Sequence, residues 1–200
     1  MADPREFWNH RYAMPGFAYG TEPNPFLKWV AATLQGPVLC LGEGEGRNAV
    51  YLAGLGREVT ALDLSPLALE KAQGLARERG VTIHTVEADL ATYEFSRASW
   101  GAVVSIWCHL PGWLRKRVHR AACEALVPGG RFVVTAYTPE QLQFDTGGPK
   151  SLALLVEPNE LRAEIEDLVS VEHFFTGQHE VNEGEWHRGT SAVVELVARR

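Results

Sequence analysis

Short apolar runs alternate with helical patterns through the first 137 residues of the chain. Each run is rich in aliphatic residues and ends at the small or polar residues typical of a turn. Five runs predict strands, near Val38–Leu41, Glu58–Leu62, Thr82–Val86, Ala102–Trp107 and Arg131–Tyr137. Between them apolar residues recur at helical spacing, as from Leu67 to Ala76, a segment that Gly80 closes. This alternation predicts a mostly parallel sheet with helices on both faces.

The remainder of the chain has a different order. A helical pattern spans Pro158–Val169, and strands near Val169–Phe175 and Ser191–Val197 follow without a further helix between them. Two strands without a crossover pair antiparallel. We therefore predict a Rossmann-like α/β fold, a doubly wound seven-stranded sheet with an antiparallel C-terminal edge hairpin. The segment Thr138–Lys150 has two open interpretations, a loop over the edge of an active site or an inert connector.

Length, composition and charge narrow the classes of function. The chain has 200 residues, 46% of them hydrophobic, which suits one domain with a single core. A formal charge of −6 argues against nucleic acid as a partner, and the basic run Arg115–Arg120 is interpreted as a solvated helix face. Three cysteines, an odd number, argue against a disulfide framework. No apolar run is long enough to span a membrane and no secretion signal begins the chain, so we expect a cytoplasmic protein.

The turn after the first predicted strand carries the strongest chemical signal. Glycine stands at every second position, Gly42, Gly44 and Gly46, and a helix follows. Glycine lets the backbone approach a ligand closely, and a helix start offers unpaired N–H groups. Arg47 stands where the dinucleotide fingerprint has its third glycine. Taken alone, the turn is equally compatible with a tight connection that binds nothing.

Carboxylates follow the next two predicted strands. Asp63 ends the second strand, ahead of Ser65, which is suited to helix N-capping, and Asp89 follows the third. In a doubly wound sheet an acid at the second strand end faces the ribose hydroxyls of a nucleoside. An acid at the next strand end can accept from the adenine amine, while a plain capping carboxylate is the alternative for Asp63. Because no lysine follows the glycine turn as a Walker site requires, we predict a nucleoside ligand with little phosphate.

These residues resemble the class I S-adenosylmethionine-dependent methyltransferases. Four segments carry the resemblance: Leu41–Asn48, Ala61–Ser65, Ala88–Leu90 and Leu126–Phe132. Within the class, the opening segments Phe7–Tyr12 and Tyr19–Leu27 and the last hairpin are similar to the TehB-like (tellurite-resistance) and thiopurine-methyltransferase-like proteins. The similarity spans nearly the whole chain. It departs from the family pattern at Cys40, where an acid often helps to order the glycine loop.

The resemblance implies S-adenosylmethionine as cofactor, with S-adenosylhomocysteine as product. The residues that it assigns to the cofactor are Tyr19, Gly42, Glu43, Gly44, Gly46, Arg47, Asn48, Asp63, Leu64, Ser65, Asp89, Leu90, Ser105 and Trp107. It also implies one methyltransferase domain over 1–200, divided into an N-terminal helical lid segment (1–35), a cofactor-binding core (36–137) and a substrate side (138–200).

Candidate catalytic residues come from two places. After the fourth predicted strand lie Cys108 and His109, and His109 is either a base near neutral pH or a cap of the next helix. The Asn/Asp-Pro-Pro-Tyr/Phe motif of methyltransferases that modify nucleic-acid and protein amines is absent there. In the TehB-like proteins a His-Arg pair, matched here by His187 and Arg188, sits beside the acceptor. The resemblance implies that the guanidinium binds an oxyanion and the imidazole takes a proton.

Three functions compete at this point. The first is in-line methyl transfer to a small molecule, such as a thiol, chalcogen or oxyanion. The second is S-adenosylmethionine binding without catalysis, which the motifs do not distinguish from the first. The third is a nucleotide-dependent oxidoreductase, against which Arg47 and the lack of a hydride-site pair argue. We expect a small-molecule acceptor as partner, no nucleic acid, no membrane, and no metal, since no Cys/His spacing supports one.

Overall fold

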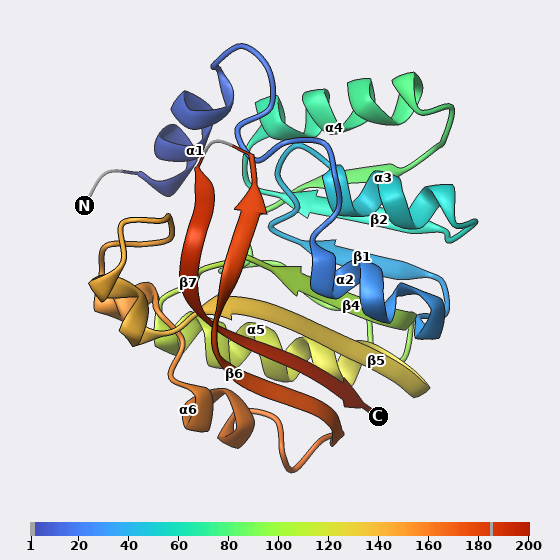
Figure 1. The fold of residues 1–200 in the computed structure, drawn as a ribbon. Coiled ribbons are helices and arrows are strands. Elements are labelled where there is room, and N and C mark those ends of the chain that lie inside the picture. Colours follow the sequence, from blue (N-terminus) through green and yellow to red (C-terminus); the bar gives the residue numbers. More distant parts are fainter. Residues whose placement is uncertain (1–2, 185) are drawn as a thin grey trace.

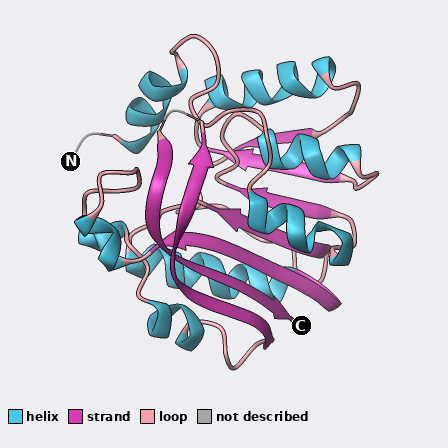
Figure 2. Cartoon of the chain, in the orientation of Figure 1, coloured by secondary structure: helices cyan, strands magenta, loops and turns pink. Residues whose placement is uncertain are grey.

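The computed structural model describes residues 3–184 and 186–200. The strands form one sheet in the order β3-β2-β1-β4-β5-β7-β6 (Figures 1 and 2). They are β1 (Val38–Leu41), β2 (Val59–Asp63), β3 (His84–Glu87), β4 (Trp100–Ile106), β5 (Leu126–Tyr137), β6 (Ser170–Glu183) and β7 (His187–Arg199). Strands β1 to β5 run parallel, and β7 pairs antiparallel with both β5 and β6. The predicted seven-stranded fold with its antiparallel C-terminal hairpin is confirmed.

Helices cover both faces of the sheet. They are α1 (Pro4–Tyr12), α2 (Pro25–Val30), α3 (Arg47–Gly54), α4 (Pro66–Glu78), α5 (Gly112–Ala125) and α6 (Pro158–Ala163), with 3-10 turns η1 (Ala31–Thr33), η2 (Pro139–Gln143) and η3 (Leu152–Leu154). Apolar residues of α2, α3 and α4 pack on one face, and those of α5 and α6 on the other. Covering both faces buries the central strands, and all residues of β1 are buried. In the part of the chain that is described, no helix combines the length and apolarity needed to cross a bilayer.

Local sequence explains where three helices begin. Asp3, Asn24 and Ser65 each accept a hydrogen bond from the first turn of α1, α2 and α4, and a proline follows each cap. Proline suits this position because its φ is already helical and its missing N–H would have no partner there. The helix predicted after Ser65 is therefore found as α4, and Gly80 lies just beyond its end.

The C-terminal hairpin is longer than the sequence predicts. Pairing between β6 and β7 runs from Ser170 opposite Arg199 to Glu183 opposite His187, well beyond the apolar segments. A hairpin ladder is made of backbone hydrogen bonds, so it continues through polar residues that sequence patterns assign to a loop. Helix α6 is shorter than predicted, because it ends at Ala163 and turns follow.

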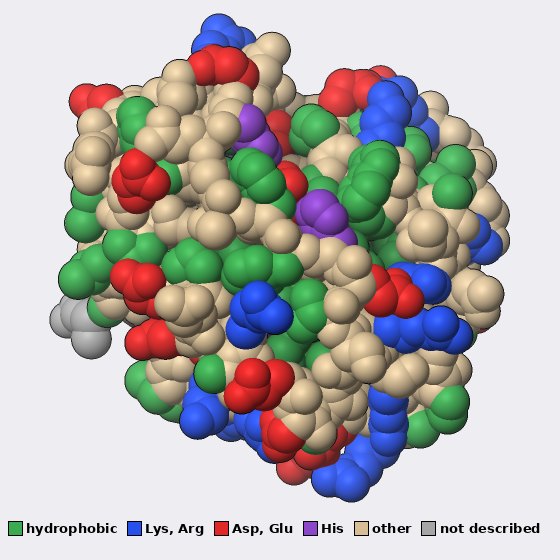
Figure 3. Space-filling view, turned by 60° about the horizontal axis from the view of Figure 1, so that its bottom comes forward, with side chains coloured by type: hydrophobic (Ala, Val, Ile, Leu, Met, Phe, Trp, Pro, Cys, Tyr) green, Lys and Arg blue, Asp and Glu red, His purple; other side chains and the backbone are tan. Residues whose placement is uncertain are grey.

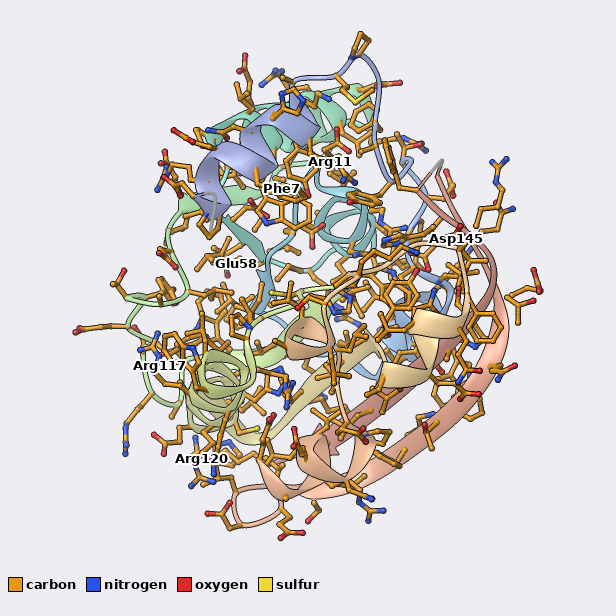
Figure 4. The ribbon with its side chains drawn as sticks, turned by 90° about the vertical axis from the view of Figure 1, so that its left-hand side faces the viewer. Phe7, Arg11, Glu58, Arg117, Arg120 and Asp145 are labelled. Carbon is orange, nitrogen blue, oxygen red and sulfur yellow. The ribbon has the colours of Figure 1, made fainter. Side chains whose placement is uncertain are left out.

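The interpretation of the basic run in α5 as a solvated face is only partly right. Lys116 and Arg117 are exposed, and Arg117 lies on the outer side of the helix (Figure 4). Arg115 and His119 are instead only 3% and 2% exposed. Arg115 Nε donates to the buried Glu164 at 2.9 Å, and His119 Nδ1 lies 2.8 Å from the same carboxylate. The contacts of Arg115 and His119 with Glu164 connect α5 to the end of α6.

Three parts of the chain meet at one edge of the sheet. The carboxyl ends of β1 to β4 lie there, α1 packs against α4 beside them, and the tip of the β6–β7 hairpin reaches the same place (Figure 1). At the tip, a Cβ on Gly184 would lie 2.5 Å from the carbonyl carbon of Tyr19. The guanidinium of Arg11 lies 4.2 Å from the ring centre of Trp186. The N-terminal segment and the hairpin tip therefore close over the strand ends together.

Candidate functional site

The glycine turn after β1 is shaped by close contacts. Gly44 and Gly46 have φ of +64° and +90°, in the left-handed region that side chains disfavour. A Cβ on Gly44 would lie 2.7 Å from the hydroxyl of Tyr12, and one on Gly46 would lie 2.6 Å from Cβ of Ala72. Both positions therefore need glycine for conformation and for space. The turn thus has the geometry that the sequence predicts, with Gly42 at its start.

Glu43 lies inside this turn. Its Oε1 accepts from the N–H groups of Asn48 and Ala49 at 2.9 and 2.7 Å, so the carboxylate caps the start of α3. Burial raises the pKa of Glu43 to about 7. Cys40 is fully buried. The resemblance described above places an acid at the position of Cys40 to order the glycine loop, and in this chain the carboxylate of Glu43 bonds to that loop's helix instead. The first turn of α3 therefore already holds a carboxylate.

Asp63 connects the end of β2 to the glycine turn. Its two carboxylate oxygens accept from the N–H groups of Gly44 and Ser65, both at 2.8 Å. Each oxygen keeps a further lone pair for a ligand hydroxyl. Burial raises the pKa of Asp63, and Ser65 donates through Oγ to Asn9 of α1 at 2.6 Å. The structure thus brings Asp63, Ser65 and the intervening Leu64 to the turn, as the sequence predicts.

The exit of β3 is more open. Asp89 is exposed, and its Oδ1 accepts from the N–H of Ala91 at 2.7 Å. Leu90 is buried in the apolar cluster of the α5 face. Both residues lie at the strand end next to Asp63, since Ala88 donates its N–H to the carbonyl of Asp63 at 3.0 Å.

The N-terminal segment covers the ends of β1 and β2. Tyr12 is 5% exposed, and Trp8 stacks on it with ring centres 5.6 Å apart. Phe7 and Arg11 lie on the same helix (Figure 4). Lys71 of α4 donates to the carbonyl oxygens of Met14 and Gly16 at 2.8 and 2.7 Å. These contacts hold α1 and the following loop against the strand ends.

A buried carboxylate that the sequence does not reveal links both sides of the edge. Glu183, at the end of β6, accepts from Asn24 Nδ2 at 2.7 Å and from Trp107 Nε1 at 2.8 Å. It also forms a buried ion pair with Arg47, the first residue of α3. Glu183 and Arg47 stand 136 positions apart, so no local pattern could have paired them. The guanidinium of Arg47, a residue that the resemblance assigns to the cofactor, is therefore already paired with a carboxylate of the protein.

Aromatic side chains gather where β4 and β5 end. We call Tyr19, Trp107, His109, Tyr137 and His187 the aromatic cluster. Trp107, in the left-handed region at φ +56°, stacks on Tyr137 with ring centres 4.2 Å apart. His187 lies 5.2 Å from Trp107 and 4.7 Å from Tyr19. The structure therefore brings together the predicted residues Tyr19, Trp107, His109 and His187, and adds Tyr137.

Burial controls the charge of this cluster. It lowers the pKa of His109 to about 4 and, helped by Arg47, the pKa of His187 to about 3. Both imidazoles are therefore neutral near pH 7, so each has one ring nitrogen with a lone pair that can accept a hydrogen bond. Beside them, burial raises the pKa of Cys108 to about 12, so this thiol is not an activated nucleophile. Cys108 packs against Gly42, and Ser105 is buried within β4.

Arg188 is not part of the aromatic cluster. It follows His187 in β7, so its side chain projects to the opposite face of the strand and is exposed. Its N–H donates to the carbonyl of Thr146 at 3.0 Å. The structure therefore does not bring the guanidinium of Arg188 to the imidazole of His187, and their joint role at an acceptor stays a prediction.

The loop after β5 packs on the cluster. A Cβ on Gly148 would lie 2.6 Å from the ring of Tyr137, and one on Gly147 would lie 3.0 Å from the ring of His187. Of the two interpretations of Thr138–Lys150, the structure therefore favours a cover over this edge.

On the face drawn in Figure 3, acidic and basic side chains are interspersed among apolar ones.

Comparisons with known proteins agree with this geometry. Residues 38–130 match the family model of a methyltransferase domain. The 2-heptyl-1-hydroxyquinolin-4(1H)-one methyltransferase of Mycobacteroides abscessus is 29% identical over 141 residues, which are 68% of this chain and 62% of that protein. The chain thus spans less than two thirds of this relative.

Solved structures share the fold over nearly the whole chain. TehB from Haemophilus influenzae has a TM-score of 0.73 at 18% identity, covering 98% of this chain and 66% of that one. A structure solved for the conversion of a disulfide bond into a thioacetal group during echinomycin biosynthesis has a TM-score of 0.78 at 22% identity, covering 99% and 92%. These structures show that the chain shares their fold, and the family match covers residues 38–130 within it.

Proposed function

We propose that this protein is an S-adenosylmethionine-dependent methyltransferase that acts on a small molecule. The observation that carries the proposal is the carboxylate of Asp63, joined by hydrogen bonds to a glycine turn whose helix start is already capped by Glu43. The family match over residues 38–130 supports it. The cofactor lies at the ends of β1 and β2, and the methyl acceptor lies at the aromatic cluster.

The residues at the strand ends fit an adenosine group. Asp63 retains lone pairs for the two ribose hydroxyls, and Asp89 is exposed at the next strand end for the adenine amine. The bound cofactor supplies a methyl group on a cationic sulfonium. The faces of Trp107 and Tyr19 attract such a cation, and the covering segments exclude water from the path of approach.

A dinucleotide fits this turn less well. In dinucleotide-binding folds the pyrophosphate sits on the N–H groups that begin the helix after the glycine turn. Here Glu43 accepts from the Asn48 and Ala49 N–H groups. A pyrophosphate would meet a carboxyl group at that place, which disfavours the oxidoreductase alternative.

We propose a thiol, chalcogen or oxyanion acceptor, in the manner of the TehB-like subgroup. Among these acceptors, the aromatic cluster favours uncharged compounds, because the guanidinium of Arg188 lies on the other face of β7 and does not offer a positive charge there. The name of the Mycobacteroides abscessus relative points in addition to a hydroxylated aromatic compound as a test substrate. His187 and His109 are the candidate proton acceptors.

The domain division stays part of the proposal. Residues 1–35 form the lid segment, 36–137 the cofactor core and 138–200 the substrate side. Three free cysteines agree with a reducing compartment, and we propose the cytoplasm.

Calorimetry with S-adenosylmethionine, S-adenosylhomocysteine and NAD tests the proposal. We expect the first two to bind and NAD not to bind, whereas binding of NAD alone would refute it. Asp63→Ala is expected to weaken cofactor binding at least about 100-fold, because two hydrogen bonds to a charged group are lost. Asp63→Asn, which keeps one acceptor oxygen, controls for misfolding and is expected to bind with intermediate affinity.

Transfer of a radiolabelled methyl group to thiols, selenite, tellurite and small hydroxylated aromatics tests catalysis. His187→Ala is expected to leave cofactor affinity within about twofold and to lower turnover about tenfold or more. Equal loss of cofactor binding in Asp63→Ala and His187→Ala would show that His187 is structural. Binding of the cofactor with no transfer to any compound would favour a binding protein without catalysis.

A further inference from the structure

Two imidazole nitrogens in the aromatic cluster are buried without a hydrogen-bond partner among the described residues, Nε2 of His109 and Nδ1 of His187. A buried polar atom that loses water without replacement costs about 1–3 kcal/mol. Such atoms mark places where a ligand supplies the missing partner. For His109 the structure also determines what kind of partner is needed.

Leu154 sets the tautomer of His109. Nδ1 of the ring lies 3.1 Å from the carbonyl oxygen of Leu154. A carbonyl oxygen only accepts, so Nδ1 carries the hydrogen and Nε2 presents a lone pair. Burial lowers the pKa of His109 to about 4, with a smaller contribution from Arg115, so this arrangement persists at neutral pH. The cluster therefore holds a fixed hydrogen-bond acceptor at Nε2.

The neighbours of this lone pair are aromatic and uncharged. The His109 ring is tilted by 15° from that of Tyr137 and by 22° from that of Trp107, with ring centres 5.5 and 6.3 Å apart. The imidazole of His187, which also packs on Tyr137, is neutral as well. An apolar body of a ligand would be in favourable contact here.

Two of the cations that act on the cluster have carboxylate partners. Arg47 is paired with Glu183, and Arg115 with Glu164 at 2.9 Å. Arg11 donates to the neutral hydroxyl of Tyr19 at 3.1 Å, and its charge acts on His187. The guanidinium that acts on His109 is that of Arg115, which is already paired, so an anionic acceptor would face the lone pair of Nε2 without an unpaired guanidinium from Arg115 to offset its charge.

Building on the proposed methyl transfer, we propose that the acceptor is a neutral thiol or hydroxyl compound with an apolar body, whose S–H or O–H donates to Nε2 of His109. This narrows the acceptor classes to neutral protic ones. It also distinguishes His109, whose tautomer is set by the carbonyl of Leu154, from His187, whose Nδ1 has no hydrogen-bond partner among the described residues.

The proposed step balances atoms and charge. The sulfur or oxygen of the acceptor bonds to the methyl carbon as the carbon–sulfur bond of the sulfonium breaks, and the electron pair of that bond returns to sulfur. The acceptor's proton passes to Nε2 of His109, which holds it as an imidazolium and then releases it to water. One cationic sulfonium and one neutral acceptor thus give two neutral products and one proton.

The test uses pairs of probes that differ only in the hydrogen concerned: phenol against anisole, and benzyl mercaptan against benzyl methyl sulfide. Benzoate serves as the anionic probe. Binding is measured by calorimetry at pH 7 with S-adenosylhomocysteine present. We expect each protic probe to bind about tenfold more tightly than its methylated partner, because the methylated compound leaves Nε2 unpaired. Benzoate is expected to bind least.

Nitrogen-15 NMR of histidine-labelled protein supplies a readout that is independent of activity. We expect a proton on Nδ1 and none on Nε2 of His109 in the free protein, and a shift of the Nε2 signal when phenol binds. His109→Phe keeps a stacked ring without the lone pair, so the preference for protic probes is expected to vanish. His84→Phe, at an exposed position of β3, is the matched control and is expected to keep it.

Several results would overturn the proposal. They are equal binding of the methylated probes, tighter binding of benzoate, binding of none of the probes, or a proton on Nε2 in the free protein. If His109→Phe does not fold, the wild-type probe series and the NMR spectrum still decide. Failure of S-adenosylhomocysteine to bind would instead refute the proposed function itself.

Discussion

The proposed cofactor side and the proposed acceptor side of the edge, called below the cofactor side and the acceptor side, are built on different physical principles. At the ends of β1 and β2 the polar groups have partners within the protein, Asp63 with Gly44 and Ser65, and Glu43 with the start of α3. At the ends of β4 and β5 the rings of the aromatic cluster pack on one another, and two imidazole nitrogens lack partners among the described residues.

The geometry of each side is determined in a different way. Backbone N–H groups that donate to Glu43 and Asp63, over at most 19 positions, order the glycine turn, so its geometry depends on two consecutive strand ends. The aromatic cluster collects side chains from the N-terminal segment, β4, β5 and the hairpin, so its geometry depends on how these elements pack. Glu183 joins the two sides, because it contacts both Arg47 and Trp107.

The strongest test of that connection is Glu183→Ala. Removing this carboxylate leaves Arg47 buried without its partner and frees the Trp107 indole N–H, so we expect the free energy of unfolding to fall by about 3 kcal/mol. Chemical denaturation measures it. Glu172→Ala removes a more exposed pair with Arg131 and is expected to cost less than about 1 kcal/mol. Equal losses would show that Glu183 does not join the two sides.

A smaller effect is expected from Gly44→Ala, which tests whether the cofactor side depends on its backbone. The change places a Cβ in a left-handed conformation and 2.7 Å from the Tyr12 hydroxyl, so we expect a loss of about 2 kcal/mol in unfolding free energy. Gly56→Ala is the matched control, since Gly56 has φ +78° but nothing within 4 Å of the added Cβ. It is expected to cost about 1 kcal/mol. Indistinguishable losses would mean that the contact with Tyr12 is unimportant.

A third effect, of similar size, concerns the pH dependence that Glu43 confers. Because burial raises its pKa to about 7, the folded protein binds more protons than the unfolded one between about pH 4.5 and 7. Its contribution to stability therefore falls as pH rises through that window. Glu43→Gln keeps an acceptor oxygen without the charge, so we expect its stability relative to wild type to improve by about 2 kcal/mol from pH 5 to pH 8. Thermal melts at both pH values measure it, and an improvement at pH 5 alone would contradict it.

Much of the cofactor side was predictable because its signals are local. The alternation of strands and helices, the glycine turn, Ser65 as a helix cap and Asp63 at a strand end all depend on residues near one another in the chain. Each corresponds to a backbone conformation or to a hydrogen bond between consecutive elements, such as that from Gly44 to Asp63, 19 positions apart. The sequence therefore determined the parallel strands, the helices between them and the positions of Asp63 and Asp89.

The contacts, side-chain directions and pKa values on the acceptor side could be determined only from the tertiary structure. The partnership of Glu183 with Arg47 spans 136 positions, and the opposite directions of His187 and Arg188 follow from the extension of β7 beyond its apolar segment. Burial of Arg115 and His119 likewise required Glu164 from a later helix. Contacts of this kind arise from packing between distant segments, and the pKa values of the imidazoles follow from the burial that packing creates.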